Sequence, residues 1–349
     1  MLTPSRLVLA RTRRGLTAVE LARKAGTSPA SIGDYEHGRR RPGPATTARL
    51  TEALGFPPGF LEADDVPEVE VAFTRQAARR QRDAAVGAAR LAIGFDGWLT
   101  SAFTFPEPDV PTWEHDDPET AAEVVRARWG IPHRPAPNLV HLLEAHGVRV
   151  FSLPPDCAGA GPFSCRHAGT PYVFLDPTAS PDQARFDAAR ELGRLTGVAD
   201  PHAFATAFLL PRAGLLAGVP RGPLTEHVVA HSATWHVSPA RLAHRLRDLG
   251  LLSRTQHATV CAQLARRAAG EDGLARRETS QLLTKVFRAL RAQGTTPHDI
   301  ARELLLDVEE LNGLVFGLVL TAVPGGEPGP PGGGDPGPPA RPNLTLVRR

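Results

Sequence analysis

The feature that most constrains the fold is an alternation of helix caps and helix stops between residues 16 and 42. Thr17 is placed to cap one short helix, and Ser28 is placed to cap a second, Pro29–Glu36, whose first residue is proline. Gly26 follows the first helix and supplies the turn, because glycine adopts the left-handed conformation at little cost. We therefore predict helices over residues 18–25 and 29–36, joined by a short turn that fixes the angle between them.

The spacing of residues around these two helices resembles the Cro/C1-type (XRE) helix-turn-helix family. The matching residues are Leu16, Thr17, Leu21, Ala22, Gly26, Thr27, Ser28, Ile32, Glu36, Gly38 and Pro42. The resemblance covers nearly all of residues 1–61 and implies a five-helix domain that binds double-stranded DNA, with the second helix of the motif in the major groove. The residues that we expect to contact DNA are Thr17, Ser28, Pro29, Ala30, Ser31, Asp34, Arg39, Arg40 and Arg41.

Readout of DNA bases would depend on few hydrogen-bond donors in the second helix. Only Ser28 and Ser31 can donate to base acceptors, and Asp34 would favour the amino group of cytosine. The two residues between the serines offer apolar contact only, for example to a thymine methyl group. We expect the arginines at positions 39–41 to contact phosphate, and the alternative is a solvated basic loop.

Charge is distributed unevenly along the chain. Residues 1–60 contain ten Arg or Lys and four Asp or Glu, a net charge of +6, so the other 289 residues sum to −3. A basic segment attached to a nearly neutral body indicates a polyanionic partner. Only Lys24 and Lys285 are lysines among 40 basic residues, however, so a coding bias toward arginine contributes to this charge.

A second informative segment spans residues 186–194 and ends in Arg190-Glu191-Leu192-Gly193-Arg194. It has the frame of a zinc-peptidase helix, His-Glu-Leu-Gly-His, in which both histidines are arginine. Two histidines at i and i+4 bind zinc on one helix face, and the glutamate activates a water molecule. Arginine offers no free lone pair and keeps its proton. The frame therefore predicts a site that binds no metal, with a vestigial Glu191; the alternative is a solvated helix with an ion pair between Glu191 and Arg194.

Several flanking segments agree with this frame in order and spacing, namely residues 138–150, 171–175, 186–189 and 204–211. Together they resemble the ImmA/IrrE family of metallopeptidase-like domains over roughly residues 118 to 260. The family usually supplies a third, acidic ligand six residues before the position of Phe204, which is Val198 here, and Asp200 lies two places away. The resemblance thus implies a zincin-like α+β domain from which the zinc ligands have been lost.

The pattern predicts a mainly α fold with a small β-sheet (α+β). We expect a connecting helix over 76–103, helices over 118–129 and 138–146, strands near 148–153, 163–167 and 171–175, a helix capped by Ser180, and helical segments over 224–252 and 278–320. The predicted domains are 1–61 (helix-turn-helix), 62–110 (linker and connecting helix), 111–270 (ImmA/IrrE-like), 271–323 (helical) and 324–349 (disordered). Eight Pro and seven Gly among the last 26 residues favour disorder.

Other candidate ligands are sparse. His227 and His231 lie at i and i+4 and form a residual metal candidate, but their valine neighbours favour a packed helix. The three cysteines, Cys157, Cys165 and Cys261, have no Cys-x-x-Cys spacing and are expected to be free thiols in a reducing cytosol. We expect no cofactor, no signal peptide and no membrane span, hence a cytoplasmic protein.

These observations favour a sequence-specific DNA-binding transcriptional regulator, dimeric on DNA, whose pseudo-peptidase domain senses a ligand or docks a protein partner. Arg190 and Arg194, one helical turn apart, could converge on an anionic effector. One alternative is a zinc metalloendopeptidase of the ImmA/IrrE type that cleaves a repressor. A second alternative is a protein-interaction module that does not bind DNA.

Overall fold

The N-terminal segment folds into four short α-helices, which pack around Leu21, Ile32 and Leu50. The structure is a computed structural model, and it describes residues 2–73, 77–114, 117–216, 224–267, 277–318 and 345–346. The helices are α1 (Pro4–Arg13), α2 (Ala18–Lys24), α3 (Pro29–Glu36) and α4 (Pro44–Leu54). The expected fifth helix is a single 3-10 turn, η1 (Phe60–Glu62), because the preceding Gly59 has φ 93° and two prolines come before it.

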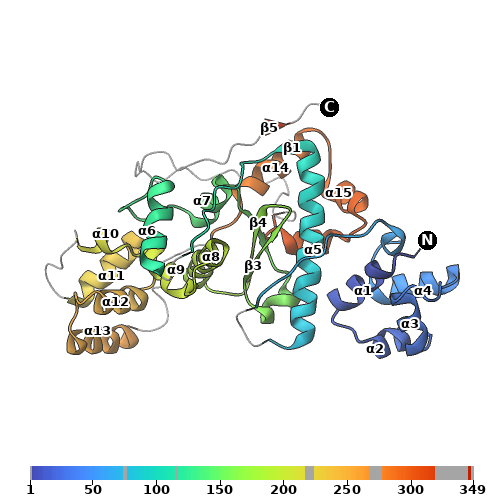
Figure 1. The fold of residues 1–349 in the computed structure, drawn as a ribbon, viewed down its shortest axis with the longest axis horizontal. Coiled ribbons are helices and arrows are strands. Elements are labelled where there is room, and N and C mark those ends of the chain that lie inside the picture. The colour runs from blue at the N-terminus through green and yellow to red at the C-terminus, as the bar shows by residue number, and fades with distance from the viewer. Residues whose placement is uncertain are drawn as a thin grey trace.

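A long helix, α5 (Arg79–Ala102), lies between these helices and the three-stranded sheet (Figure 1). Small residues along α5 allow close approach on the α1 side. A Cβ atom at Gly87 would lie 3.1 Å from the Cβ atom of Arg13 and 3.4 Å from Leu9. About two turns further along α5, Phe95 packs against Phe151 of the sheet. The expected connecting helix is therefore confirmed, and it is a core element that contacts both of its neighbours.

The sheet has the strand order β2-β4-β3, with β2 (Arg149–Ser152), β3 (Phe163–His167) and β4 (Thr170–Leu175). Strand β2 pairs with β4 in parallel, and β3 pairs with β4 in an antiparallel hairpin that turns at residues 168 and 169. Both turn residues have positive φ, 46° and 82°, as a two-residue hairpin requires. All three strands fall where the sequence predicts them.

Successive residues of β4 point to opposite faces of the sheet and enter two separate apolar cores. Tyr172 and Phe174 belong to a first core that includes α1, α5 and the C-terminal helices. Val173 and Leu175 belong to a second core formed with the helices of the other face. Those helices are α6 (Pro118–Arg128), α7 (Leu139–Ala145), α8 (Pro181–Thr196), α9 (Pro201–Leu209), α10 (Arg212–Leu216), α11 (Leu224–Trp235), α12 (Pro239–Asp248) and α13 (Arg254–Arg266).

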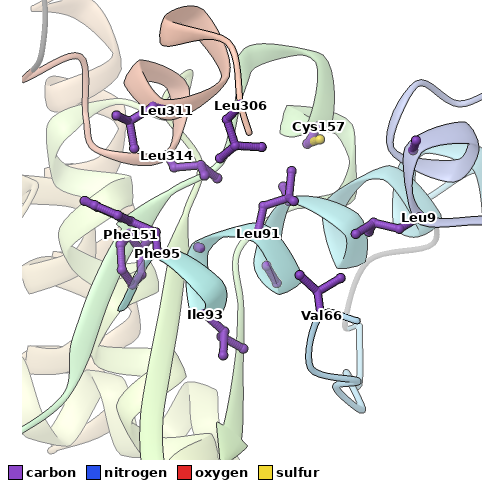
Figure 2. Packing of buried hydrophobic residues seen from close by; sticks show 14 of the residues in the cluster. Leu9, Val66, Leu91, Ile93, Phe95, Phe151, Cys157, Leu306, Leu311 and Leu314 are labelled. Carbon is purple, nitrogen blue, oxygen red and sulfur yellow. The ribbon is translucent and has the colours of Figure 1, made fainter. Parts of the chain in front are cut away.

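Two predicted helical segments are interrupted. The segment 224–252 is divided between α11 and α12, because His236 has φ 54° and Ser238 caps a new helix. The segment 278–320 contains α14 (Gln281–Ala292), α15 (Pro297–Leu304) and α16 (Val308–Leu314). Figure 2 shows that the C-terminal segment returns to the first core, where Leu306, Leu311 and Leu314 join Leu9 and Leu91.

Two short strands complete the fold. Strand β1 (Phe103–Thr104) pairs in an antiparallel manner with β5 (Thr345–Leu346). A 3-10 helix, η2 (Pro155–Ala160), lies between β2 and β3 in the chain. The predicted disordered tail, 324–349, lies outside the described residues except for β5. Within the described ranges, no helix is long and apolar enough to cross a membrane.

Candidate functional site

The geometry of α2 and α3 is set by local chemistry that can be read in the sequence. Thr17 and Glu20 form a reciprocal capping box at the start of α2, with the hydroxyl of Thr17 accepting the Glu20 N–H at 3.1 Å. Ser28 caps α3 by accepting the Ser31 N–H at 3.1 Å. Gly26, at φ 60°, makes the turn between them. The predicted caps are all present, and the Thr17 side chain is used to cap α2.

The first turn of α3 presents the residues that we expected to face DNA. Ser28, Pro29 and Ala30 are exposed, and Ser31 and Asp34 are partly exposed. The hydroxyls of Ser28 and Ser31 lie 2.9 Å apart, so one of them donates to the other. This bond uses one of the two hydroxyl protons, so the proton of the accepting hydroxyl stays free to donate to a ligand.

The three arginines after α3 form an exposed basic loop. Arg39 donates from Nε to the Asp34 carboxylate at 2.9 Å, which reduces the capacity of Asp34 to accept from a base. Within the described part of the chain, the guanidiniums of Arg40 and Arg41 have no ion-pair partner. Two fully available positive charges therefore flank α3, and a third is shared with Asp34.

Comparisons with known proteins bear on this N-terminal segment. Residues 5–63 match the family model of a helix-turn-helix domain. The N-terminal segment is a helix-turn-helix domain. The comparisons with curated proteins and with solved structures gave no match. A helix-turn-helix domain suggests DNA binding, whereas nothing identifies the ImmA/IrrE-like domain, whose resemblance stays a prediction.

The helix-turn-helix domain is fastened to the body by a buried ion cluster. Arg13, at 2% side-chain exposure, donates from Nε to Glu310 of α16 at 2.6 Å and from Nη1 to Asp156 of η2 at 2.7 Å. Arg14 contacts the second oxygen of Glu310 at 2.7 Å. Burial alone would lower the pKa of Arg13, but Glu310 and Asp156 outweigh it and raise that pKa. This long-range cluster is invisible in the sequence, where Arg13 and Glu310 are 297 positions apart.

The zinc-peptidase frame lies on α8, and its three charged residues contact one another. The Glu191 carboxylate is fully buried, forms an ion pair with Arg194 at 3.1 Å from its Nε, and accepts a hydrogen bond from the Ser164 hydroxyl of β3 at 3.1 Å. Arg190 pairs with Asp187 at 2.9 Å and with Glu191 at 3.4 Å. Burial raises the pKa of Glu191, and the two arginines partly oppose that shift. Two guanidiniums and two carboxylates thus form a neutral cluster.

The position where the ImmA/IrrE family usually supplies its third, acidic zinc ligand holds no metal-binding side chain. Val198 is buried in the second apolar core. Asp200 accepts the N–H groups of residues 202 and 203 as the cap of α9. Gly193 is held close to Phe204, because a Cβ atom there would lie 2.8 Å from the ring. The frame is therefore packed as a structural helix against α9.

The remaining candidates, two histidines and two cysteines, do not form a common site. The rings of His227 and His231 lie 4.1 Å apart, and in the described ranges no third ligating side chain joins them. Cys157 and Cys165 are buried free thiols, and burial raises the pKa of each to about 12. Both thiols are therefore protonated and unreactive at neutral pH. A cluster that we did not expect, formed by His244, His257 and Cys261, is considered below.

Proposed function

We propose that this protein is a sequence-specific DNA-binding transcriptional regulator that acts in the cytoplasm. The observation that carries the proposal is the helix-turn-helix domain at residues 5–63, whose α3 exposes its first turn beside the exposed basic loop of residues 39–41. Ser28 and Ser31 would read bases, and residues 39–41 would hold the phosphate backbone. The Asp34–Arg39 pair is a brace for that loop, which makes a cytosine contact by Asp34 less favourable than the sequence suggested.

The proposed active form on DNA is a homodimer. A single helix-turn-helix domain with two serine donors makes few base contacts, so two half-sites about 34 Å apart would be needed for useful affinity. This spacing predicts a pseudo-palindromic operator. Selection of bound sequences from a random duplex pool would reveal it.

The experiment that tests DNA binding is the salt dependence of affinity for duplex DNA. Each lost phosphate contact lowers the slope of log K against log salt by about 0.9, so Arg39→Ala/Arg40→Ala/Arg41→Ala should flatten it by about 2 to 3 per protomer. Arg288, Arg291 and Arg302, exposed on α14 and α15, give a control triple alanine variant with the same loss of charge. An unchanged slope in the first variant would remove the phosphate role. Absence of binding by the wild type at low salt would favour the interaction-module alternative.

For the body we propose a pseudo-peptidase that docks a partner or senses a signal. Support comes from the ion cluster of α8, in which Arg190 and Arg194 fill the ligand positions and are neutralised by Asp187 and Glu191. These contacts favour the ion-pair interpretation of both arginines over a site for an anionic effector. The zinc-endopeptidase alternative requires a peptidase activity that is lost in Glu191→Gln. Finding such an activity would overturn the proposal.

A further inference from the structure

Helices α12 and α13 bring three ligand-type side chains together at the end of the molecule distant from the helix-turn-helix domain (Figure 1). His257 and Cys261 are four residues apart on α13 and share one face of that helix. His244 comes from α12. His257 Nε2 lies 3.1 Å from His244 Nδ1 and 3.4 Å from Cys261 Sγ. One ligand atom from each residue lies within 4.8 Å of both others.

These separations match those of ligands around one small ion. Zinc binds imidazole nitrogen at about 2.0–2.1 Å and thiolate at about 2.3 Å, so tetrahedral geometry places two nitrogens about 3.4 Å apart and nitrogen and sulfur about 3.6 Å apart. The two measured distances fall within about 0.3 Å of these values. The third side of the triangle, between His244 and Cys261, is at most 4.8 Å, so these two ligand atoms would approach each other by up to about 1.2 Å around an ion.

The backbone that carries the three residues is held by contacts independent of any ion. Ser238 caps α12, and Ser253 forms a capping box with Gln256 at the start of α13. Leu242 and Val260 are fully buried in the second core, which fixes the two helices against each other. The side chains therefore start from positions set by packing, which reduces the ordering that ion binding would require.

We propose that His244, His257 and Cys261 form a binding site for a borderline-soft divalent cation of the zinc class. Two imidazoles and one thiolate suit zinc and exclude the hard cations magnesium and calcium, which prefer oxygen ligands. Three protein ligands leave the fourth tetrahedral position for water or an exogenous group. Since His244 is exposed and the other two residues are partly exposed, that position faces solvent and the ion can exchange.

The competing interpretation is a pair of surface hydrogen bonds that both end on His257 Nε2, one with the Cys261 thiol and one with His244 Nδ1. It accounts for the same distances with neutral groups and needs no ion. The two interpretations differ in one measurable respect, because only a metal site requires a deprotonated sulfur. The test should therefore report on the thiolate.

The experiment is a cobalt titration of the reduced, metal-free full chain, followed by displacement with zinc. Cobalt bound by two imidazoles and a thiolate gives intense visible bands and a near-ultraviolet sulfur-to-cobalt band. We expect one cobalt per chain, and loss of the sulfur band in Cys261→Ser. His244→Asn should weaken binding at least tenfold. His231→Asn, a matched histidine on α11, and Glu191→Gln, in the frame of α8, should bind as the wild type does.

A second measurement needs no variant. Cys157 and Cys165 are buried, so Cys261 should be the first thiol to react with a maleimide, and one equivalent of zinc should slow that reaction at least tenfold. Absence of stoichiometric cobalt at micromolar concentrations would overturn the proposal. So would a sulfur band that survives in Cys261→Ser, or zinc that does not protect the thiol.

Discussion

Replacing Glu310 by glutamine should loosen the attachment of the helix-turn-helix domain to the body. Glu310 is 3% exposed and receives Arg13 at 2.6 Å and Arg14 at 2.7 Å on its two oxygens. Glutamine keeps the shape and one acceptor but removes the negative charge. The Arg13 guanidinium then stays buried with Asp156 as its remaining counter-charge, and the Asp156 side chain is 56% exposed.

The size of the effect follows from that partial compensation. Breaking a buried ion pair by removing one partner costs about 3–5 kcal/mol, because it leaves an uncompensated charge. The solvated Asp156 offsets part of this cost, so we expect a loss of about 2–3 kcal/mol in the free energy of unfolding. The double variant Arg13→Met/Glu310→Met removes both buried charges and should recover most of the loss.

The assay is urea unfolding followed by tryptophan fluorescence and by far-ultraviolet circular dichroism. Glu309→Gln is the matched control, because Glu309 is the neighbouring residue on α16 and is exposed. We expect the control to differ from the wild type by less than about 0.5 kcal/mol. A cost for Glu310→Gln no larger than that of Glu309→Gln would refute the reasoning that the buried cluster holds the two parts together.

Two further predictions concern the body. Burial raises the pKa of Glu144 to about 7, opposed by hydrogen bonds from α14. In the folded state Glu144 keeps its proton up to about pH 7, whereas in the unfolded state it releases the proton near its ordinary pKa of about 4.5. The free energy of unfolding therefore falls by roughly 3 kcal/mol as the pH rises from about 4.5 to 7. Glu144→Gln should lack this loss when its unfolding is compared with wild type at pH 5 and 8, and exposed Glu123→Gln should retain it. Gly193→Ala should lower the free energy of unfolding by about 1–3 kcal/mol, because the added methyl group overlaps Phe204. Gly97→Ala, which has open space around it in α5, should raise that free energy by up to about 1 kcal/mol. Thermal unfolding measures both, and a stabilised Gly193→Ala variant would contradict the packing argument.

The elements that could be predicted from the sequence are those that local chemistry determines. Thr17, Ser28 and Ser180 all cap the helices they were expected to cap, because a cap depends on a few neighbouring residues. The strands were found because β-branched and aromatic residues cluster between turn signals. The fold class is accordingly confirmed as mainly helical with a three-stranded mixed sheet.

The features that escaped prediction depend on contacts between distant residues or on backbone conformations without a compositional signal. The break between α11 and α12 occurs at His236, and a non-glycine residue at φ 54° cannot be recognised from its identity. The cluster of His244, His257 and Cys261 had a weak signal in the His-x-x-x-Cys spacing of α13. Its third member lies on another helix, so only the fold shows that the three meet.

The arrangement of the two cores limits how the body can influence the DNA-binding domain. The helix-turn-helix domain, α5 and the C-terminal helices share the first core, whereas α8, α12 and α13 share the second. The sheet separates them, and buried polar contacts join α5 to the sheet face of the first core, because Asp96 of α5 accepts from Tyr172 of β4 at 2.8 Å and from Arg149 of β2 at 3.0 Å. A signal received on α8, or an ion bound between α12 and α13, that travels through the sheet would reach α5, which contacts α1 directly. Since packed layers resist small displacements, such a signal requires a second stable arrangement of the sheet against α5, and the Asp96 contacts are the bonds that such an arrangement would have to exchange.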